Sequence, residues 1–361
     1  MSKPQVLIAG TSTLAFNCGE RRAKTADKPP PPQLANPKNG IVWSKEEQAS
    51  KLGAVAEVLE LTSSSREEFY KDLASGGKYA NIVGIYRHND SASAIGVFDK
   101  DLIEHLPSSV KYIAHNGAGY DQIDIAAATA KNIQVSHTPG AVDAATATVG
   151  AFLAISAMRQ FARAEQNVRN GKWKTGLSPA RDPEEKTLGI IGMGGIGKAL
   201  ARRLIAFDMK VIYHNRNEIT PPPDFPCKYI ANVDDLLKQS DIVSLNLPLN
   251  EKTKGSFGKK QFDLMKDGSV LVNTARGAVV DEEALLAALD SGKLFSAGLD
   301  VFPDEPNVNP KLLSNDKITV LPHMGTETRD SQKKMELLVL DNLISALSGK
   351  GLLNQVPEQK K

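Results

Sequence analysis

Three side chains with complementary chemistry follow three predicted strands in the C-terminal part of the chain. They are Arg276, Glu305 and His323, which come shortly after the predicted strands 269–273, 295–300 and 318–321. Ligands of open parallel sheets bind beyond the carboxyl ends of the strands. We therefore expect the three side chains to converge at one edge of a sheet.

Together, these groups could stabilise an oxygen that gains negative charge and donate a proton to it. The paired donors of Arg276 can hold a carboxylate or a carbonyl oxygen in a way that lysine reproduces poorly. Imidazole titrates near neutral pH, so His323 can donate a proton, and a neighbouring Glu305 would favour the imidazolium. Alternatively, the arginine faces solvent, the glutamate belongs to a Pro- and Asp-rich turn, and the histidine bonds a backbone carbonyl. All three arising together by chance is improbable.

A glycine-rich segment lies between a predicted strand, 187–191, and a predicted helix. It reads Gly192, Met193, Gly194, Gly195, Ile196 and Gly197. In the GxGxxG pattern, Gly192 permits a tight turn, Gly194 lets a pyrophosphate approach the backbone, and Gly197 lets helix and strand pack closely. The amides and dipole of the helix N-terminus attract phosphate. The segment predicts a dinucleotide site rather than an ordinary glycine-rich turn.

The next predicted strand, 210–214, is followed by Asn215 and Arg216. An NAD-specific site places a carboxylate about 20 residues beyond the glycines to bind the ribose 2′-hydroxyl. A neutral Asn and a cationic Arg instead suit a 2′-phosphate. We expect NADP(H) to be preferred, with NAD(H) also possible. The alternative is that Arg216 stacks on adenine without discriminating.

The elements that must position these residues alternate between β-branched runs and helical segments, which is typical of parallel α/β units. The predicted strands are 5–9, 55–61, 81–86, 111–115, 133–137, 187–191, 210–214, 241–247, 269–273, 295–300 and 318–321. A long helix is predicted over about 144–170, and a final helix over about 328–347. Pro29–Pro32, within a surface excursion over 17–44, and Pro221–Pro223 predict irregular loops.

The composition excludes several classes of protein. The 361 residues are 41% apolar and 24% charged, with a net charge of +2, as expected for a folded globular chain. No basic block suggests a nucleic-acid partner, and no apolar run is long enough for a membrane span. The two cysteines, Cys18 and Cys227, form no CxxC spacing, so neither a disulfide framework nor a metal site is expected. We expect a cytoplasmic enzyme.

Four ordered motifs resemble the D-isomer-specific 2-hydroxyacid dehydrogenases. They are Asn116–Asp121, Val272–Gly277, Gly298–Pro306 and Leu321–Thr326. The similarity runs from about Val55 to Gly349 and is closest to the fungal glyoxylate/hydroxypyruvate reductases. The excursion over 17–44 departs from the family's short connection.

The resemblance assigns further residues to the site. Arg276, Glu305 and His323 take the catalytic roles described above, and Arg276 and His323 also bind substrate. Ala118 and Gly119 belong to a turn whose amides bind the substrate carboxylate, with an ordinary glycine turn as the alternative. Arg87 lies in a loop that faces the substrate. The cofactor contacts are extended to Thr146, Leu247, Pro248, Thr274, Ala275, Asp300 and Gly325. Asp300 would hold the nicotinamide amide, or else cap a turn.

The predicted fold is α/β, with two Rossmann-like lobes built on parallel sheets. The substrate lobe is discontinuous, formed by 1–142 and 326–361, and the cofactor lobe spans 143–325. The resemblance implies reduction of glyoxylate or hydroxypyruvate to the D-2-hydroxy acid by a homodimer. Two alternatives remain: a D-mandelate-type dehydrogenase acting on larger 2-oxo acids, and a nucleotide-gated, corepressor-like binding protein.

Overall fold

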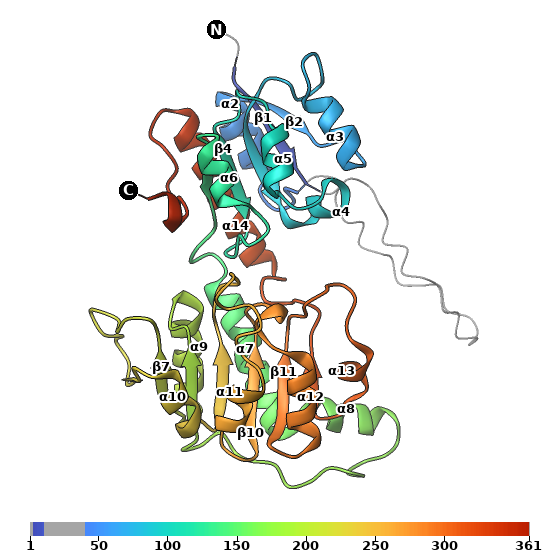
Figure 1. The fold of residues 1–361 in the computed structure, drawn as a ribbon, viewed down its shortest axis with the longest axis vertical. Helices are drawn as coiled ribbons and strands as arrows, with labels where there is room; N and C mark the ends of the chain where they lie inside the picture. The colour runs from blue at the N-terminus through green and yellow to red at the C-terminus, as the bar shows by residue number, and fades with distance from the viewer. Residues whose placement is uncertain (1–2, 11–39, 361) are drawn as a thin grey trace, which may run out of the picture. The chain divides into compact units, whose positions relative to one another are not determined.

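The computed structural model describes residues 3–10 and 40–360, which form two compact units (Figure 1). Unit 1 comprises Met1–Thr138 and Gln332–Lys361, and unit 2 comprises Pro139–Ser331. Residues 17–39 of the predicted surface excursion, including Pro29–Pro32 and Cys18, lie outside the described residues. Assigning the substrate to the first unit and the cofactor to the second stays a prediction.

Unit 1 is built on a five-stranded parallel sheet with the strand order β2-β1-β3-β4-β5. Its strands are β1 (Gln5–Ala9), β2 (Glu57–Glu60), β3 (Ile82–His88), β4 (Tyr112–Asn116) and β5 (Gln134–Ser136). The central strands are apolar on both sides because helices cover both faces of the sheet. The long strand β3 therefore carries its last residues, Arg87 and His88, to the carboxyl edge of a buried sheet.

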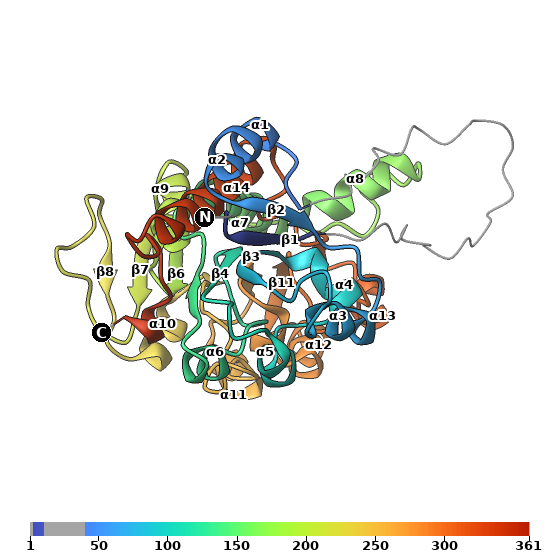
Figure 2. The ribbon, with the colours of Figure 1, turned by 90° about the horizontal axis from the view of Figure 1, so that it is seen from above.

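The helices of unit 1 pack on opposite faces of this sheet (Figure 2). One face bears α3 (Arg66–Leu73), α4 (Ala92–Ile95), α5 (Lys100–His105) and α6 (Ile125–Ala130). The other bears α1 (Lys45–Glu47), a π-helical turn (Gln48–Leu52), α2 (Gly53–Val55) and α14 (Arg329–Leu347). Short 3-10 turns cover Asn89–Ser91 and Pro357–Gln359. The buried Glu336 of α14 accepts hydrogen bonds from the amides of Val42, Trp43 and Ser44, each at 2.8 Å, and so holds this segment on the helix.

Unit 2 is built on a seven-stranded parallel sheet with the order β12-β11-β10-β9-β6-β7-β8. Its strands are β6 (Thr187–Ile191), β7 (Lys210–His214), β8 (Lys228–Tyr229), β9 (Ile242–Leu245), β10 (Ser269–Asn273), β11 (Leu294–Leu299) and β12 (Ile318–Val320). The strand order reverses between β6 and β9. Open α/β sheets bind ligands beyond the carboxyl ends of their strands at such a reversal.

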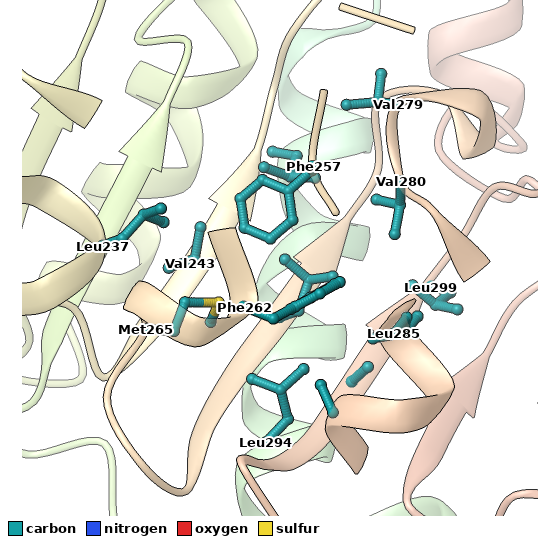
Figure 3. Packing of buried hydrophobic residues seen from close by; sticks show 14 of the residues in the cluster. Leu237, Val243, Phe257, Phe262, Met265, Val279, Val280, Leu285, Leu294 and Leu299 are labelled. Carbon is teal, nitrogen blue, oxygen red and sulfur yellow. The ribbon is translucent and has the colours of Figure 1, made fainter. Parts of the chain in front are cut away.

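Helices also cover both faces of the second sheet. The long α7 (Asp143–Arg159) and α9 (Gly195–Ile205) pack on one face. The other face bears α10 (Val233–Gln239), α11 (Lys259–Leu264), α12 (Glu282–Asp290) and α13 (Pro310–Ser314). Figure 3 shows the core beneath α11 and α12, in which the rings of Phe257 and Phe262 meet edge to face at 5.2 Å. Well-filled cores on both faces give the loops at the carboxyl edge a rigid base.

The predicted α/β fold with two parallel sheets is confirmed. The predicted bounds of 5–9, 187–191, 210–214 and 269–273 coincide with those of strands β1, β6, β7 and β10, and the final helix differs by one residue. Pro221–Pro223 form a loop, as expected. The two-residue strand β8 was not predicted. No helix within residues 3–10 and 40–360 is both long and apolar enough to cross a membrane.

The prediction of one helix over 144–170 is wrong. Gln160 adopts a left-handed conformation, with φ of 55°, and separates α7 from α8 (Phe161–Arg169). No glycine or proline marks this break. The cause is tertiary: α7 is buried against the sheet, whereas Phe161 and Val168 of α8 remain exposed.

Candidate active site

His323 and Glu305 form a hydrogen-bonded pair at the carboxyl edge of the unit 2 sheet. The Nδ1 atom of His323 lies 2.7 Å from Oε2 of Glu305, with the two side chains 45% and 35% exposed. His323 follows β12 and adopts a left-handed conformation, with φ of 55°. Its amide donates to the carbonyl of Asp300 at 2.8 Å, which fixes this uncommon backbone. The pair leaves Nε2 as the imidazole nitrogen available for a ligand.

The main chain around Arg276 is held by Asn273, the last residue of β10. The side-chain amide of Asn273 donates to the carbonyl of Arg276 at 2.9 Å, and its oxygen accepts from the amide of Ala275 at 3.0 Å. A side chain at Gly277 would lie 2.0 Å from the main chain of Phe302. This close approach brings the Arg276 turn against the loop that carries Glu305.

The surroundings of Glu305 keep it ionised. Burial opposes ionisation, but the hydrogen bond with His323, the amide of Phe302 and the charges of His323 and Arg276 together lower the pKa of Glu305. The Phe302 amide donates to Oε1 at 2.8 Å, while Oε2 faces the imidazole. A fixed carboxylate beside an imidazole favours the imidazolium, the form that donates a proton. The structure thus brings all three predicted catalytic residues to one region of unit 2.

Asp300, at the end of β11, caps the turn that carries His323. Its buried carboxylate accepts from the amides of Met324 and Gly325, at 2.6 and 2.9 Å. Burial raises the pKa of Asp300 to about 6, although those amides and His323 oppose the rise. Thr146 of α7 donates to the carbonyl of Gly325 at 3.2 Å. Of the two roles open from the sequence, the turn cap is the one that the contacts show; a bond to nicotinamide stays a prediction.

The glycine segment forms the turn between β6 and α9. Gly192 has a φ of 100°, and a side chain there would meet the carbonyl of Asn246 at 2.4 Å. A side chain at Gly197 would meet the carbonyl of Gly192 at 2.5 Å, so helix and strand pack as the motif predicts. At the exposed Gly194, by contrast, an added Cβ has nothing within 4 Å. This open backbone at the start of an 11-residue helix fits a pyrophosphate.

The predicted ribose-binding residues stand at the end of β7 beside this turn. The side-chain oxygen of Asn215 accepts from the amide of Met193 at 2.8 Å, which ties the strand end to the glycine segment. Arg216 is exposed. The other residues of the predicted cofactor site also follow strands: Leu247 and Pro248 come after β9, and Thr274 and Ala275 after β10. Ile196 lies in the first turn of α9.

The predicted substrate-binding residues of unit 1 differ in how far they are buried. Ala118 and Gly119 are half-buried in the turn after β4. Arg87 is fully buried, and its guanidinium contacts Asn89, His115 and Gln122 within the unit. It also stacks over Phe98, at 5.6 Å from the ring centre. The Arg87 side chain therefore binds other residues of unit 1 and is not exposed to solvent.

Sequence reasoning missed two residues that shape the site. Asn273 lies within the motif Val272–Gly277 but was given no role, although an Asn at the end of a buried strand is a signal for a turn-holding side chain. Asp143 begins α7, and its carboxylate would lie 1.9 Å from a side chain at Gly195. It therefore stands beside the N-terminus of α9, and burial raises its pKa. Among the described residues, no group of three His, Cys, Asp or Glu is placed to hold a metal ion.

Comparison with known proteins gives a consistent result. Residues 151–325 match the model of the D-isomer specific 2-hydroxyacid dehydrogenase NAD-binding domain. The chain is 48% identical to 4-methyl-2-oxopentanoate reductase A of Aspergillus oryzae over 321 residues, 89% of this chain and 97% of the relative. It is 41% identical to glyoxylate reductase 1 of Saccharomyces cerevisiae, over 85% of this chain and 90% of the relative.

Solved structures agree with this result. A glyoxylate reductase from Paecilomyes thermophila matches with a TM-score of 0.87 and 46% identity, covering 99% of both chains. The NADPH-dependent glyoxylate/hydroxypyruvate reductase of Sinorhizobium meliloti, in complex with NADP and malonate, matches with a TM-score of 0.77 and 27% identity, covering 99% of this chain and 98% of that one. The resemblance to fungal glyoxylate reductases drawn from the four motifs is confirmed. This chain belongs to the family of D-isomer specific 2-hydroxyacid dehydrogenases.

Proposed function

We propose that the protein reduces glyoxylate or hydroxypyruvate with NADPH to the D-2-hydroxy acid. The observation that carries the proposal is the 2.7 Å contact between His323 and Glu305, whose loop packs against the Arg276 turn. A basic clamp and a proton donor are what reduction of a 2-oxo acid requires. Relatives at 41% and 46% identity are named glyoxylate reductases.

Each side chain has a defined part in the reaction. NADPH, when bound, supplies the hydride that reaches the keto carbon. Arg276 orients the 2-oxo acid through paired hydrogen bonds and stabilises the negative charge that grows on the keto oxygen. His323 donates the proton to that oxygen from Nε2, because Nδ1 is bonded to Glu305. Glu305, held ionised, stabilises the imidazolium before the proton leaves.

The cofactor would lie along the carboxyl edge of the unit 2 sheet. Its pyrophosphate suits the open backbone of Gly194 at the start of α9. The exposed Arg216 and the neighbouring Asn215 suit a 2′-phosphate, which supports NADPH over NADH. The Sinorhizobium meliloti relative is described as NADPH-dependent. A ratio of kcat/KM values that clearly favours NADH would contradict this preference.

A larger, branched 2-oxo acid is the second candidate substrate. It is favoured by the 48% identity to 4-methyl-2-oxopentanoate reductase A, which covers nearly all of that relative. Both candidates use the same Arg276 and His323 chemistry and differ only in the side chain that the site must hold. We also propose a homodimer, formed through unit 2. The cytoplasmic location expected from the sequence stays a prediction.

A steady-state panel of 2-oxo acids with each cofactor tests the proposal. We expect NADPH oxidation with glyoxylate or hydroxypyruvate, reduced by about 10³-fold or more in His323→Ala, because a positioned acid contributes about 10²–10⁴-fold. A clear preference for 4-methyl-2-oxopentanoate would favour the second candidate. No turnover of any 2-oxo acid would overturn the proposal and favour a nucleotide-gated binding protein.

A further inference from the structure

We propose that His115 and His137 are positioning residues, which clamp the carbonyls of the turn 117–119 so that its amides bind the carboxylate of the substrate. The buried Arg87 sets His115 in the state that the clamp requires. This inference rests on the proposed function, because it concerns how the same 2-oxo acid is held. All the contacts that carry it lie within unit 1.

Each carbonyl of the turn is tied to a donor inside the unit. The carbonyl of Gly117 accepts from the amide of Thr138 at 3.0 Å. The carbonyl of Ala118 lies 2.8 Å from Nδ1 of His137, and that of Gly119 lies 2.9 Å from Nε2 of His115. Carbonyls only accept hydrogen bonds, so both imidazole nitrogens must carry their protons. Two histidines from the ends of neighbouring strands therefore fix the direction of successive peptide groups.

The amides of the same three residues have no hydrogen-bond partner within the described chain. Gly117 is buried, and a buried amide without a partner is rare and costly. Adjacent free amides in a turn form a concave site for an anion. With the carbonyls held and the amides unused, the turn is prepared for a small carboxylate.

Arg87 decides the protonation of His115. Its Nη1 lies 3.2 Å from Nδ1 of His115, and a guanidinium only donates. Nδ1 must therefore accept, which places the single proton on Nε2, facing Gly119. Burial, together with the charge of Arg87 and of His88, keeps the pKa of His115 well below its ordinary value. Gln122 and Asn89 hold the guanidinium in place.

The contact between His115 and the turn also requires a glycine at position 117. A side chain at Gly117 would lie 2.5 Å from Nε2 of His115. The imidazole can thus reach Gly119 only if residue 117 lacks a side chain. His137 is less buried and packs edge to face against Tyr120, at 5.1 Å between ring centres. Burial lowers its pKa as well.

The two histidines can be tested with reciprocal amide substitutions, because each uses a different nitrogen. A glutamine amide reaches about as far as Nε2, and an asparagine amide about as far as Nδ1. His115→Gln should therefore preserve the bond to Gly119, and His115→Asn should lose it. At His137 the order reverses: Asn should preserve the bond to Ala118, and Gln should lose it. His105→Gln, at an exposed histidine of α5, is the matched control.

We expect the non-preserving variants to raise the KM for glyoxylate about 10–100-fold, the equivalent of one hydrogen bond to a charged group. The preserving variants and the control should stay within about threefold, with kcat changed less than KM and the KM for NADPH unchanged. Calorimetric binding of oxalate should weaken in the same order. If His115→Asn does not fold, as thermal unfolding would show, the His137 pair still tests the clamp.

The outcomes separate the clamp from the proposed reaction. If the protein reduces no 2-oxo acid but binds oxalate in a manner that depends on His115 and His137, the reaction is wrong and the clamp stands. If it reduces glyoxylate with the same KM in all four variants, the clamp is overturned. Failure of the unmodified protein both to turn over 2-oxo acids and to bind oxalate would overturn both.

Discussion

In the proposed reaction, Arg276 is the residue that holds the substrate through paired hydrogen bonds. Asn273 fixes the main chain on both sides of the turn, so Arg276→Lys should leave the turn in place while replacing a planar fork by a point charge. We expect kcat/KM for glyoxylate to fall about 100-fold, equivalent to about 2.7 kcal/mol, with the KM for NADPH unchanged. Steady-state kinetics measures both. A fall of less than about threefold would mean that the paired bonds do not form.

Glu305 gives a prediction about pH at the same scale. Its pKa lies below its ordinary value of 4.5, so the carboxylate stays ionised from mildly acidic to alkaline pH and does not itself shape the rate there. In Glu305→Gln the imidazolium loses its neighbouring anion and gives up its proton more readily. We expect the alkaline limb of the kcat/KM profile to move to lower pH, and activity at neutral pH to fall about tenfold or more.

Asp304→Asn is the control for that profile, because it removes a carboxylate one residue away that is exposed and makes no contact with His323. Its alkaline limb should match that of the unmodified protein. The same displacement in both variants would mean that general surface charge, rather than the Glu305 contact, sets the profile.

At the scale of elements, two glycines in the turn between β6 and α9 are expected to serve different purposes, one in cofactor binding and the other in folding. An alanine side chain at Gly194 has nothing within 4 Å, and the backbone there is extended. Gly194→Ala should therefore keep the stability of the protein but weaken NADPH binding by about tenfold, or about 1.4 kcal/mol. Gly197→Ala would place Cβ 2.5 Å from the carbonyl of Gly192 and should lower the free energy of unfolding by about 1–3 kcal/mol.

Thermal unfolding and cofactor fluorescence titration check this pair of variants. The contrast is informative because both substitutions add the same methyl group three residues apart. Unchanged NADPH affinity in Gly194→Ala would show that the pyrophosphate does not approach that backbone. Unchanged stability in Gly197→Ala would show that helix and strand have room to separate.

The sequence predicted those elements whose signals are local. Apolar β-branched runs bounded by polar or turn-forming residues located β6, β7 and β10, and the GxGxxG pattern located the turn before α9. The break at Gln160 was missed because burial of α7, rather than a breaking residue, decides where the helix ends. The two-residue β8 is too short to show the alternation of apolar and polar residues that marks a strand.

The site was predictable to the same extent. The positions of Arg276, Glu305 and His323 beyond the ends of strands could be predicted, since each follows an apolar run in the sequence. Their catalytic roles stay a prediction. The roles of Asn273 and Asp143 could not be predicted, because they depend on which loops and helices pack against one another. The burial of Arg87 could not be predicted either, because it depends on side chains from other parts of unit 1. Its contact with substrate stays a prediction.

At the scale of the whole molecule, unit 2 exposes four large apolar side chains along residues 152–173. Phe152 of α7, Phe161 and Val168 of α8, and Trp173 beyond it are 46–70% exposed. The amphipathic α8 buries little of its apolar side within the chain. Exposed apolar groups, aromatic ones above all, are typical of protein interfaces. This supports the proposed homodimer through unit 2.

Charge placed on this surface should dissociate the dimer. We expect the unmodified protein to sediment at twice its chain mass of 38.9 kDa, and Phe161→Glu with Trp173→Glu to sediment at the mass of one chain, because a buried unpaired carboxylate is costly. Leu353→Glu changes a comparably exposed apolar residue of unit 1 and should leave the dimer intact. Analytical ultracentrifugation at matched concentration distinguishes the cases. A dimer disrupted by Leu353→Glu alone would place the interface on unit 1, and an unmodified protein that sediments as a monomer would rule the interface out.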